Sequence, residues 1–447
     1  MKAAFLMMLK GLPHGKMPTQ QNSEGFKLKV SWRSNKKLKP IVILERLKRS
    51  SIIDSEGRVS YNGFEKFELD SVLFSMIDFH KEYSHHTSRS FYSLALDFWI
   101  VSGSTTAEQF MQCMNKQVVE YGKKPELEYI AVTSISLIGG FPIERIKLSG
   151  STVQCFPKGL PKKYRTRIAF DSRWKEMGSP MPEHYCPVVI RFKSKSAMDG
   201  MEFALAELDY VRGVFSLILN SSYKAPLGGG NGSRLPINSV MLGGMHTLHN
   251  QKGKLASGGV YWFESEYTEV DSLYINESKR AHAIDFFNQI HSRIYLHKDG
   301  HVLKEAIVRF VRAFDGKDKN FALQKIWAAL ETLMAPGENN TDLVVKRCSF
   351  MFGDRAYHHQ VLEHLKDYRN RSVHTGRSIE NPNDYCYQAQ NFFRQAVIFH
   401  ASNAEFFSSL RESNEFLDLS DSIQELERKK LLIEKAIIFL TPPNEAT

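Results

Sequence analysis

Three residues that could act on a phosphate ester lie close together in the last fifth of the sequence: Arg369, Asn370 and His374. Histidine can take up or give away a proton near neutral pH. Arginine keeps its positive charge and binds phosphate oxygens through two parallel hydrogen bonds, and asparagine can orient either partner. These residue types therefore suggest the binding of a phosphodiester and proton transfer at its oxygens.

The surrounding residues predict that this group lies at the end of a helix. Val361, Leu365 and Tyr368 recur at the spacing of one helix face. Gly376 follows, and a glycine is common where a helix ends. The predicted helix spans residues 358–375.

The position of each residue on this helix suggests its surroundings. At about 100° per residue, Asn370 and His374 lie on the same face. Arg369 instead lies beside Leu362, at the edge of the apolar stripe. A guanidinium turned toward a core needs a carboxylate or phosphate partner. Glu331, beside the apolar stripe of an upstream helix, is the candidate carboxylate, so a structural Arg369–Glu331 ion pair is the alternative to a phosphate-binding role.

The region resembles the HEPN superfamily, whose motif is an arginine followed after a few residues by a histidine at a helix end. It resembles in particular the Apea-like HEPN domain proteins of prokaryotes, over residues 300–410. Those proteins usually have an upstream Leu-Glu-x-Leu core, which Leu330, Glu331 and Leu333 fit. One departure is Thr375, which stands before the glycine that in many members follows the histidine directly.

This resemblance implies a helical bundle and a metal-independent endoribonuclease whose cleft forms between two paired bundles. It implies a role in defence against phage or in toxin-like growth arrest. It also implies a catalytic group with supporting neighbours: Arg369, Asn370 and His374 as catalytic residues, supported by Glu331, Tyr368 and Arg371.

The residue types agree with such a reaction. RNA carries its own nucleophile, the 2′-hydroxyl, and internal attack leaves a 2′,3′-cyclic phosphate and a 5′-hydroxyl. His374 could move the proton and Arg369 could stabilise charge on the phosphate. Five residues on a helix place these two side chains about 140° apart, so we expect two copies of the chain to share a site. No metal-ligand spacing is present, and no metal or other cofactor is expected.

Two other functions stay open at this point. The chain could be a non-catalytic RNA-binding or sensor protein that dimerises through its helical bundle, or a purely structural interaction protein. A second arginine–histidine pair, Arg394 and His400, lacks the neighbouring asparagine and the following glycine. We interpret it as part of a packing helix with a peripheral histidine.

The composition favours a polyanionic partner. The chain has 447 residues, of which 42% are apolar and 24% charged, and a formal net charge of +10. This charge favours RNA as a partner, with tRNA among the candidates. Five widely spaced cysteines indicate neither a disulfide framework nor a zinc site, so a reducing cytoplasm is expected. No apolar run approaches the roughly 20 residues of a membrane span, and no membrane partner is expected.

The hydrophobic pattern predicts an α+β protein in which a strand-rich mixed α/β domain, residues 1–276, precedes an all-α HEPN-like helical bundle, residues 277–447. We expect the first domain to regulate or recognise. The glycine-rich run 227–234 lacks the Gly-Lys-Ser/Thr ending of a phosphate-binding loop and is predicted to be a plain loop. The other predicted segments are strands within 92–98, 126–192 and 259–270, and helices at 64–80, 198–219, 278–294, 302–315, 320–335, 342–352, 384–408 and 420–440.

Overall fold

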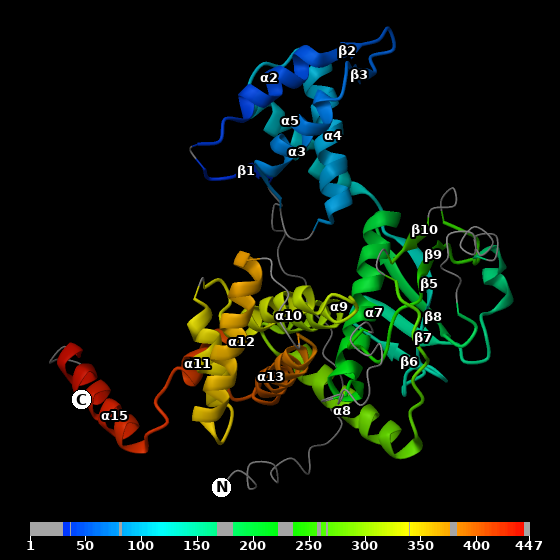
Figure 1. Cartoon of the computed structure of the whole chain (residues 1–447). Coiled ribbons are helices and arrows are strands. Elements are labelled where there is room, and N and C mark those ends of the chain that lie inside the picture. Colours follow the sequence, from blue (N-terminus) through cyan, green and yellow to red (C-terminus); the bar gives the residue numbers. More distant parts are fainter. Residues whose placement is uncertain are drawn as a thin grey trace. The chain divides into compact units, whose positions relative to one another are not determined.

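The computed structural model describes residues 30–35, 37–79, 83–167, 182–221, 236–256, 261–264, 267–338, 340–375 and 382–441. The chain forms two compact units that divide between Lys124 and Pro125 (Figure 1). Each unit has its own hydrophobic core.

The first unit consists mainly of helices around a small core. Its centre contains the buried side chains of Leu44, Leu73, Trp99, Phe110 and Met114. Its elements in chain order are β1 (Ser31–Trp32), α2 (Pro40–Ser50), β2 (Ser51–Ile53), β3 (Val59–Tyr61), α3 (Glu65–Ser75), β4 (Ile77–Asp78), α4 (His85–Val101) and α5 (Ala107–Lys123). The helix predicted at 64–80 is therefore present but shorter, because the chain leaves it after Ser75 to pair β4 with β1. Residue 80 lies outside the described residues.

The strand predicted at 92–98 is wrong, because these residues lie in helix α4. Ser84 caps the helix by accepting a hydrogen bond from the backbone N–H of Thr87. Tyr92, Leu96 and Trp99 are buried with helical spacing. Leu94 and Phe98, which supported the alternating pattern, are exposed. Exposed apolar residues on a helix thus imitated the period of a strand.

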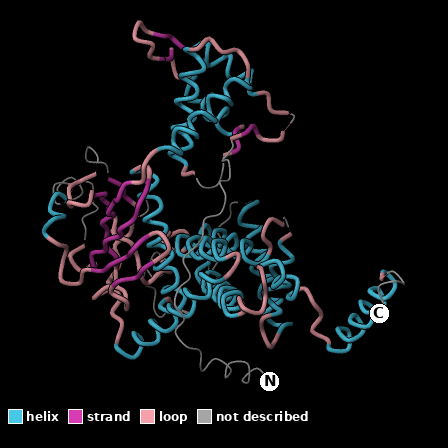
Figure 2. Tube along the Cα trace, turned by 180° about the vertical axis from the view of Figure 1, so that it is seen from behind, coloured by secondary structure: helices cyan, strands magenta, loops and turns pink. Residues whose placement is uncertain are grey.

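The second unit is built on a six-stranded antiparallel sheet, whose strands are magenta in Figure 2 and labelled in Figure 1. The strand order is β10-β9-β5-β8-β7-β6. The long helix α7 (Ala197–Leu219) packs against one face through a core that includes Ala131, Val153 and Ile190. The strands are β5 (Leu127–Ile135), β6 (Arg145–Lys147), β7 (Ser151–Cys155), β8 (Cys186–Ser194), β9 (Met245–His249) and β10 (Tyr261–Phe263).

The sheet confirms much of the strand prediction and the helix predicted at 198–219. Two segments differ. Thr166 and Arg167 belong to a 3₁₀ segment, Lys162–Arg167, rather than to a strand, and residues 168–170 lie outside the described residues. Of the strand predicted at 259–270, residues 261–263 form β10, while 267–270 are irregular and the rest lies outside the described residues. The run 227–234 also lies outside them.

Helices follow the sheet to the end of the described chain. They are α8 (Glu277–Leu296), α9 (Gly300–Ala313), α10 (Lys319–Met334), α11 (Thr341–Phe350), α12 (Arg355–Thr375), α13 (Pro382–Ser402), α14 (Leu410–Leu417) and α15 (Ile423–Leu440). Every segment predicted as a helix after residue 276 contains one. The segment predicted at 384–408 ends earlier, at Ser402, and α14 was not predicted. Ser409 caps α14 by accepting a hydrogen bond from the backbone N–H of Glu412. No described helix has the length and apolar character needed to cross a bilayer.

The strands and the following helices share one hydrophobic core. The rings of Phe141 and Phe215 stack with centroids 5.2 Å apart, and Phe215 stacks on Phe287 of α8 at 4.9 Å. This continuous stack crosses residue 276, where the domain boundary was predicted. Residue 276 therefore marks the change from strands to helices, while the division between compact units lies at Lys124 and Pro125.

Candidate functional site

Helix α12 packs into the helical bundle through its predicted apolar stripe. Leu362, Leu365 and Tyr368 are completely buried. The Tyr368 hydroxyl donates a hydrogen bond of 2.7 Å to Oδ1 of Asn320, at the start of α10. The Tyr368 ring also packs on the ring of Tyr385, with centroids 4.6 Å apart. Tyr368 therefore holds the helix turn that carries the candidate site.

Arg369 lies between α12 and α10. Its Nη1 donates a hydrogen bond of 3.0 Å to Oδ1 of Asn370, and its Nη2 lies 3.8 Å from Oε1 of Glu331. The side chains of Arg369 and Glu331 keep 28% and 29% of their exposure. Nε of Arg369 is buried and has no hydrogen-bond partner among the described residues. The structure thus brings Arg369, Asn370 and Glu331 together, with unused donor capacity on the guanidinium.

The predicted Arg369–Glu331 ion pair is present, but it is long. A separation of 3.8 Å lies beyond hydrogen-bonding distance, and solvent reaches both side chains. Partly exposed ion pairs of this kind contribute about 1 kcal/mol or less to stability. The pair can hold the guanidinium in place without using up its hydrogen-bond donors.

Arg371 has different surroundings from Arg369. It forms an ion pair of 2.9 Å with Asp367, one helix turn earlier, and both side chains are more than half exposed. The supporting residue Arg371 thus lies on the outer surface of α12, away from Glu331.

His374 lies in the last turn of α12, which continues without interruption to Thr375. Its side chain and the following glycine lie outside the described residues. On a continuous helix, position 374 shares a face with Asn370, one turn earlier, and is about 140° from Arg369. The helix backbone therefore keeps the divergence of the two positions that was expected from the sequence.

Gln324 is a neighbour of the site that sequence reasoning missed. Its Nε2 donates a hydrogen bond of 3.2 Å to Oγ of Ser372, and that hydroxyl donates to the carbonyl of Arg369 at 2.9 Å. Gln324 precedes Glu331 by seven residues, so both occupy one face of α10. This spacing was the signal that could have identified Gln324.

The other histidines of α12 have ordinary structural roles. His358 stacks on the ring of Phe352 with centroids 3.9 Å apart, and Nδ1 donates to the carbonyl of Asp354. His364 is exposed and contacts the ring edge of Tyr385. Within the described ranges, no group of three or more His, Cys, Asp or Glu side chains is arranged to hold a metal ion.

The second arginine–histidine pair belongs to a packing helix, as expected, but its histidine is not peripheral. His400 is 1% exposed because α14 covers it. Since the hydroxyl of Ser413 donates to the carbonyl of Leu410, Nδ1 of His400 donates to that hydroxyl, over 3.0 Å. Burial, together with the charges of His297 and Arg347, lowers the pKa of His400 to about 3.

A buried ionic cluster, also missed from the sequence, joins α7 to the end of α9. Arg212 is fully buried and binds Asp209 and Asp315 with both terminal nitrogens, at 2.6 to 2.7 Å. Arg312 contacts Asp209 and binds Glu264 at 2.7 Å. Every charge in the cluster has an opposite partner, so the arrangement fits a structural role.

One branch of this cluster ends in a buried histidine. His246 lies between the hydroxyl of Thr133, at 2.7 Å, and the carboxylate of Glu264, at 2.9 Å. Burial lowers the pKa of His246. Burial alone would raise the pKa of Glu264, but the hydrogen bond with His246 and the charge of Arg312 outweigh it and bring that pKa to about 2. Thr133 and His246 are closed to solvent, whereas Glu264 keeps 24% of its side-chain exposure and lines a cavity together with Arg312.

The candidate site therefore consists of Arg369 and Asn370 in contact, Glu331 beside them, and His374 one turn further along the same helix. Comparison with known proteins adds no relative, because no protein-family model, curated protein or solved structure matches this chain.

Proposed function

We propose that this protein is a metal-independent endoribonuclease of the HEPN type, and that its helices from α9 to α13 form a HEPN-like bundle. The observation that carries the proposal is the guanidinium of Arg369. It is held at a helix–helix contact by Asn370, lies 3.8 Å from its nearest carboxylate, and keeps hydrogen-bond donors for a phosphate. The net charge of +10 supports an RNA partner.

In the proposed reaction the 2′-oxygen of a ribose attacks the adjacent phosphorus. The bond between phosphorus and the 2′-oxygen forms, and the bond to the 5′-oxygen breaks. His374 accepts the proton of the 2′-hydroxyl, and a water molecule gives the proton that the leaving 5′-oxygen takes up. The histidine then returns its proton to water. The products are a 2′,3′-cyclic phosphate and a 5′-hydroxyl.

Arg369 and Asn370 serve the phosphate in this scheme. The planar guanidinium binds two phosphate oxygens and stabilises the charge that grows on them. The Asn370 side chain accepts a hydrogen bond from Arg369 and so fixes its direction. Glu331 holds the other end of the guanidinium from α10. Tyr368 fixes the helix turn from below.

A second copy of the chain completes the proposed site. Positions 369 and 374 diverge by about 140° on one helix, so one phosphate cannot face both of them squarely. Two bundles that face each other supply a histidine from one copy opposite an arginine from the other. The cleft then forms between the copies.

Helix α15 offers a surface for this pairing, because none of its residues is buried. It has the seven-residue repeat of a coiled coil. The positions that face a partner in such a repeat hold apolar residues with one lysine: Ile423, Leu426, Lys430, Ile433, Ile437 and Leu440. A single lysine in such a seam is a known device for fixing register at a cost in stability.

The flanking charges of α15 favour a parallel arrangement of two copies. In a parallel pair, Lys429 of one helix approaches Glu434 of the other, which are opposite charges. In a fully overlapped antiparallel pair, flanking positions of the same kind meet, so Glu427 of one helix would approach Glu434 of the other, which are like charges. Charge complementarity thus selects a parallel pair of identical chains.

The substrate is proposed to be a structured cellular RNA, with tRNA among the candidates, and the context a cytoplasmic role in phage defence or toxin-like growth arrest. A second function, a non-catalytic RNA-binding or sensor protein, is favoured by one observation. The Arg369–Glu331 ion pair alone could explain why the arginine lies where it does.

Cleavage of end-labelled RNA by the wild type and by His374→Ala separates the two functions. We expect the wild type to leave 2′,3′-cyclic phosphate ends, to spare RNA with a 2′-deoxy substitution at the cut site, and to work in the presence of a chelator. His374→Ala should be inactive. His364→Ala is the matched control, because it removes an exposed histidine from the same helix. Binding without cleavage by the wild type would favour the sensor protein.

A further inference from the structure

The face of the sheet opposite α7 is only partly covered. Ile130, Val132 and Val189 on this face form a small core with Tyr164. Arg167 holds this covering segment to the sheet by donating hydrogen bonds to the hydroxyl of Thr247 and the carbonyl of Met245, at 3.0 and 2.9 Å. The cover ends there, and beyond it the face carries charged residues.

Strand register places two of these charges in one row. Lys147 of β6 lies opposite Thr152 of β7, Thr152 lies opposite Arg191 of β8, and Arg191 lies opposite Ile130 of β5. Residues directly opposite in an antiparallel ladder point to the same side of the sheet. Lys147 and Arg191 therefore lie on the face of Ile130, two strands or about 10 Å apart.

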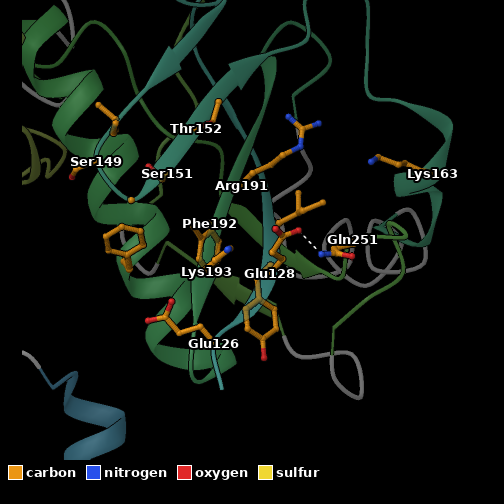
Figure 3. Close-up of a pocket in the computed structure, with 15 residues that line it drawn as sticks. Glu126, Glu128, Ser149, Ser151, Thr152, Lys163, Arg191, Phe192, Lys193 and Gln251 are labelled. Atoms are coloured by element: carbon orange, nitrogen blue, oxygen red, sulfur yellow. Dashed lines mark hydrogen bonds between the residues drawn. The ribbon is translucent and has the colours of Figure 1, made fainter. Parts of the chain in front are cut away.

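A third cation reaches this row from the covering segment. Lys163 is exposed and, with Arg191, lines an open cavity of about 810 Å³. In Figure 3 the side chains of Lys163 and Arg191 extend toward one another from the 3₁₀ segment and from β8. We call Lys147, Lys163 and Arg191 the basic track.

The position of Lys163 is fixed by the turn that follows β9. Gly253 adopts φ +81°, and a Cβ there would lie 2.5 Å from the carbonyl oxygen of Lys163. Thr166 donates a hydrogen bond to the carbonyl of Gly253. The same turn carries the exposed residues Lys252 and Lys254. Close backbone contact thus holds Lys163 at the edge of the cavity, with two more cations behind it.

The cations of the basic track lack carboxylate partners. No described Asp or Glu lies within ion-pairing distance of them, and Arg191 donates instead to the neutral side chain of Gln154, at 3.0 Å. The cavity also contains two carboxylates. Glu128 accepts a hydrogen bond from Gln251 and lies opposite Lys193 in the strand register, and Glu126 lies at the strand end. The basic track therefore keeps a net positive charge beside these two carboxylates.

The cavity continues round the end of the strands to aromatic side chains. Tyr129 and Phe203 line it there, and both pack on Phe192 with ring centroids 6.1 and 6.0 Å away. Phe203 keeps 37% of its exposure. Cations that follow a backbone, together with exposed aromatic rings on which bases stack, are the combination that binds single-stranded nucleic acid.

We propose that the basic track binds the phosphate backbone of a single-stranded segment of RNA, with Phe203 and Tyr129 stacking on its bases. The inference takes its ligand class from the proposed function, but it does not depend on the cleavage chemistry. The contacts go to phosphates, so the track recognises strand and charge rather than base sequence. In this proposal, the sheet of the second unit helps to bind the RNA substrate.

Binding of a fluorescent 20-nucleotide unpaired RNA tests this, measured by anisotropy on the full chain carrying His374→Ala. Lys147→Gln/Lys163→Gln should weaken binding about ten-fold and reduce the slope of log K against log salt by about 1.4, the value for two lost phosphate contacts. Lys279→Gln/Lys298→Gln is the matched control, since both lysines are exposed and lie on α8 or just after it. The control should bind within about two-fold of the parent.

Two outcomes would overturn the proposal: unchanged binding by the track variant, or equal weakening by the control, which would reduce the effect to net charge. Poly-glutamate that competes as well as RNA would also overturn it, in favour of an acidic protein partner. Phe203→Leu should weaken binding of unpaired RNA but not of a duplex of the same length. Equal losses of binding for the unpaired RNA and the duplex would show that Phe203 does not stack on bases. The proposal of a single-stranded ligand would then be wrong.

Cleavage and binding measured together distinguish a failure of the proposed enzyme from a failure of the basic track. If the wild type cuts no RNA but the track variant loses binding, the proposed enzyme fails and the basic track stands. If the wild type cuts RNA and the track variant binds and cuts equally well, the basic track fails and the enzyme stands.

Discussion

The guanidinium of Arg369 donates a hydrogen bond of 3.0 Å to the side chain of Asn370, the next residue in the chain. Neighbours on a helix point about 100° apart, so this contact bends the arginine side chain round the helix. The hydrogen bond brings the guanidinium toward the face of Asn370, which position 374 shares, while Nη2 stays 3.8 Å from Glu331. In the proposed reaction, Asn370 therefore sets the direction in which Arg369 meets the phosphate.

Substitution of Arg369 separates a phosphate-binding role from a structural one. Arg369→Ala should reduce cleavage by about a hundred-fold or more, the usual effect of removing one donor to a developing negative charge. It should lower the free energy of unfolding by about 1 kcal/mol or less, because its partner Glu331 is partly solvated. Cleavage rates and urea unfolding of the same preparations give both values.

Arg369→Lys sharpens this test. It keeps the charge but loses the planar fork, so cleavage should remain low while stability returns. Arg371→Lys is the matched control, since Arg371 pairs with Asp367 on the outer surface of α12. A lysine variant at 369 with full activity would show that charge alone is needed there.

Two inactive chains should restore activity when they are mixed. If the site is shared, a chain carrying His374→Ala and a chain carrying Arg369→Ala form a mixed dimer with one intact site. Random mixing at equal amounts should recover about one quarter of wild-type activity, since half of the dimers are mixed and each has one of two sites. The measurement is cleavage after unfolding and refolding the two chains together. No recovery would mean that each copy contains a complete site.

Pairing through α15 should depend on its seam. Ile433→Glu places a charge at a seam position and should convert the dimer to a monomer, as measured by sedimentation or light scattering. Leu432→Glu makes the same chemical change on the next residue, which is also exposed but lies outside the seam, and should leave the dimer intact. If both variants dissociate the protein, or neither does, the coiled-coil arrangement is incorrect.

Stability should depend on pH through His400. Its folded-state pKa, about 3, lies below the ordinary value of 6.5 because the ring is buried. The unfolded chain then binds more protons between these values. The stabilising effect of the neutral, buried His400 is present above pH 6.5. It is lost as the pH falls toward 3, by up to about 1.4 kcal/mol per pH unit.

His400→Asn keeps a donor for Ser413 without the titrating ring. Urea unfolding between pH 4 and 7 should show a smaller slope for this variant than for the wild type. His246 and His249 also have lowered pKa values from burial, so some slope should remain. An unchanged slope would place the proton uptake elsewhere.

The helical part of the fold could be predicted because its apolar residues recur at one helical period. Leu323, Ile326 and Trp327, for example, mark the buried face of α10. Helix α4 was missed because Leu94 and Phe98 are apolar but exposed, and a sequence does not tell which apolar residues face solvent. Helix α14 was missed because eight residues are too few to show a period clearly.

The candidate site could be predicted only in part. The contact between Arg369 and Glu331 followed from their places beside two apolar stripes. The hydrogen bond from Arg369 to Asn370 did not, because a helix wheel treats neighbouring side chains as independent. The buried cluster around Arg212 could not be found either, since Asp315 joins it from more than a hundred residues away.

The phenylalanine stack that crosses residue 276 has a consequence for how the second unit unfolds. Phe215 contacts Phe141 on one side and Phe287 on the other, so strands and helices lose their packing partners together. Residues from 125 onward should melt in one cooperative transition, and a fragment that starts at residue 277 should be insoluble. In that fragment, Phe287 and Ile290 of α8 would lose their packing against α7 and become exposed. A cut between Lys124 and Pro125 divides two cores without opening either, and is the place to separate the chain for expression.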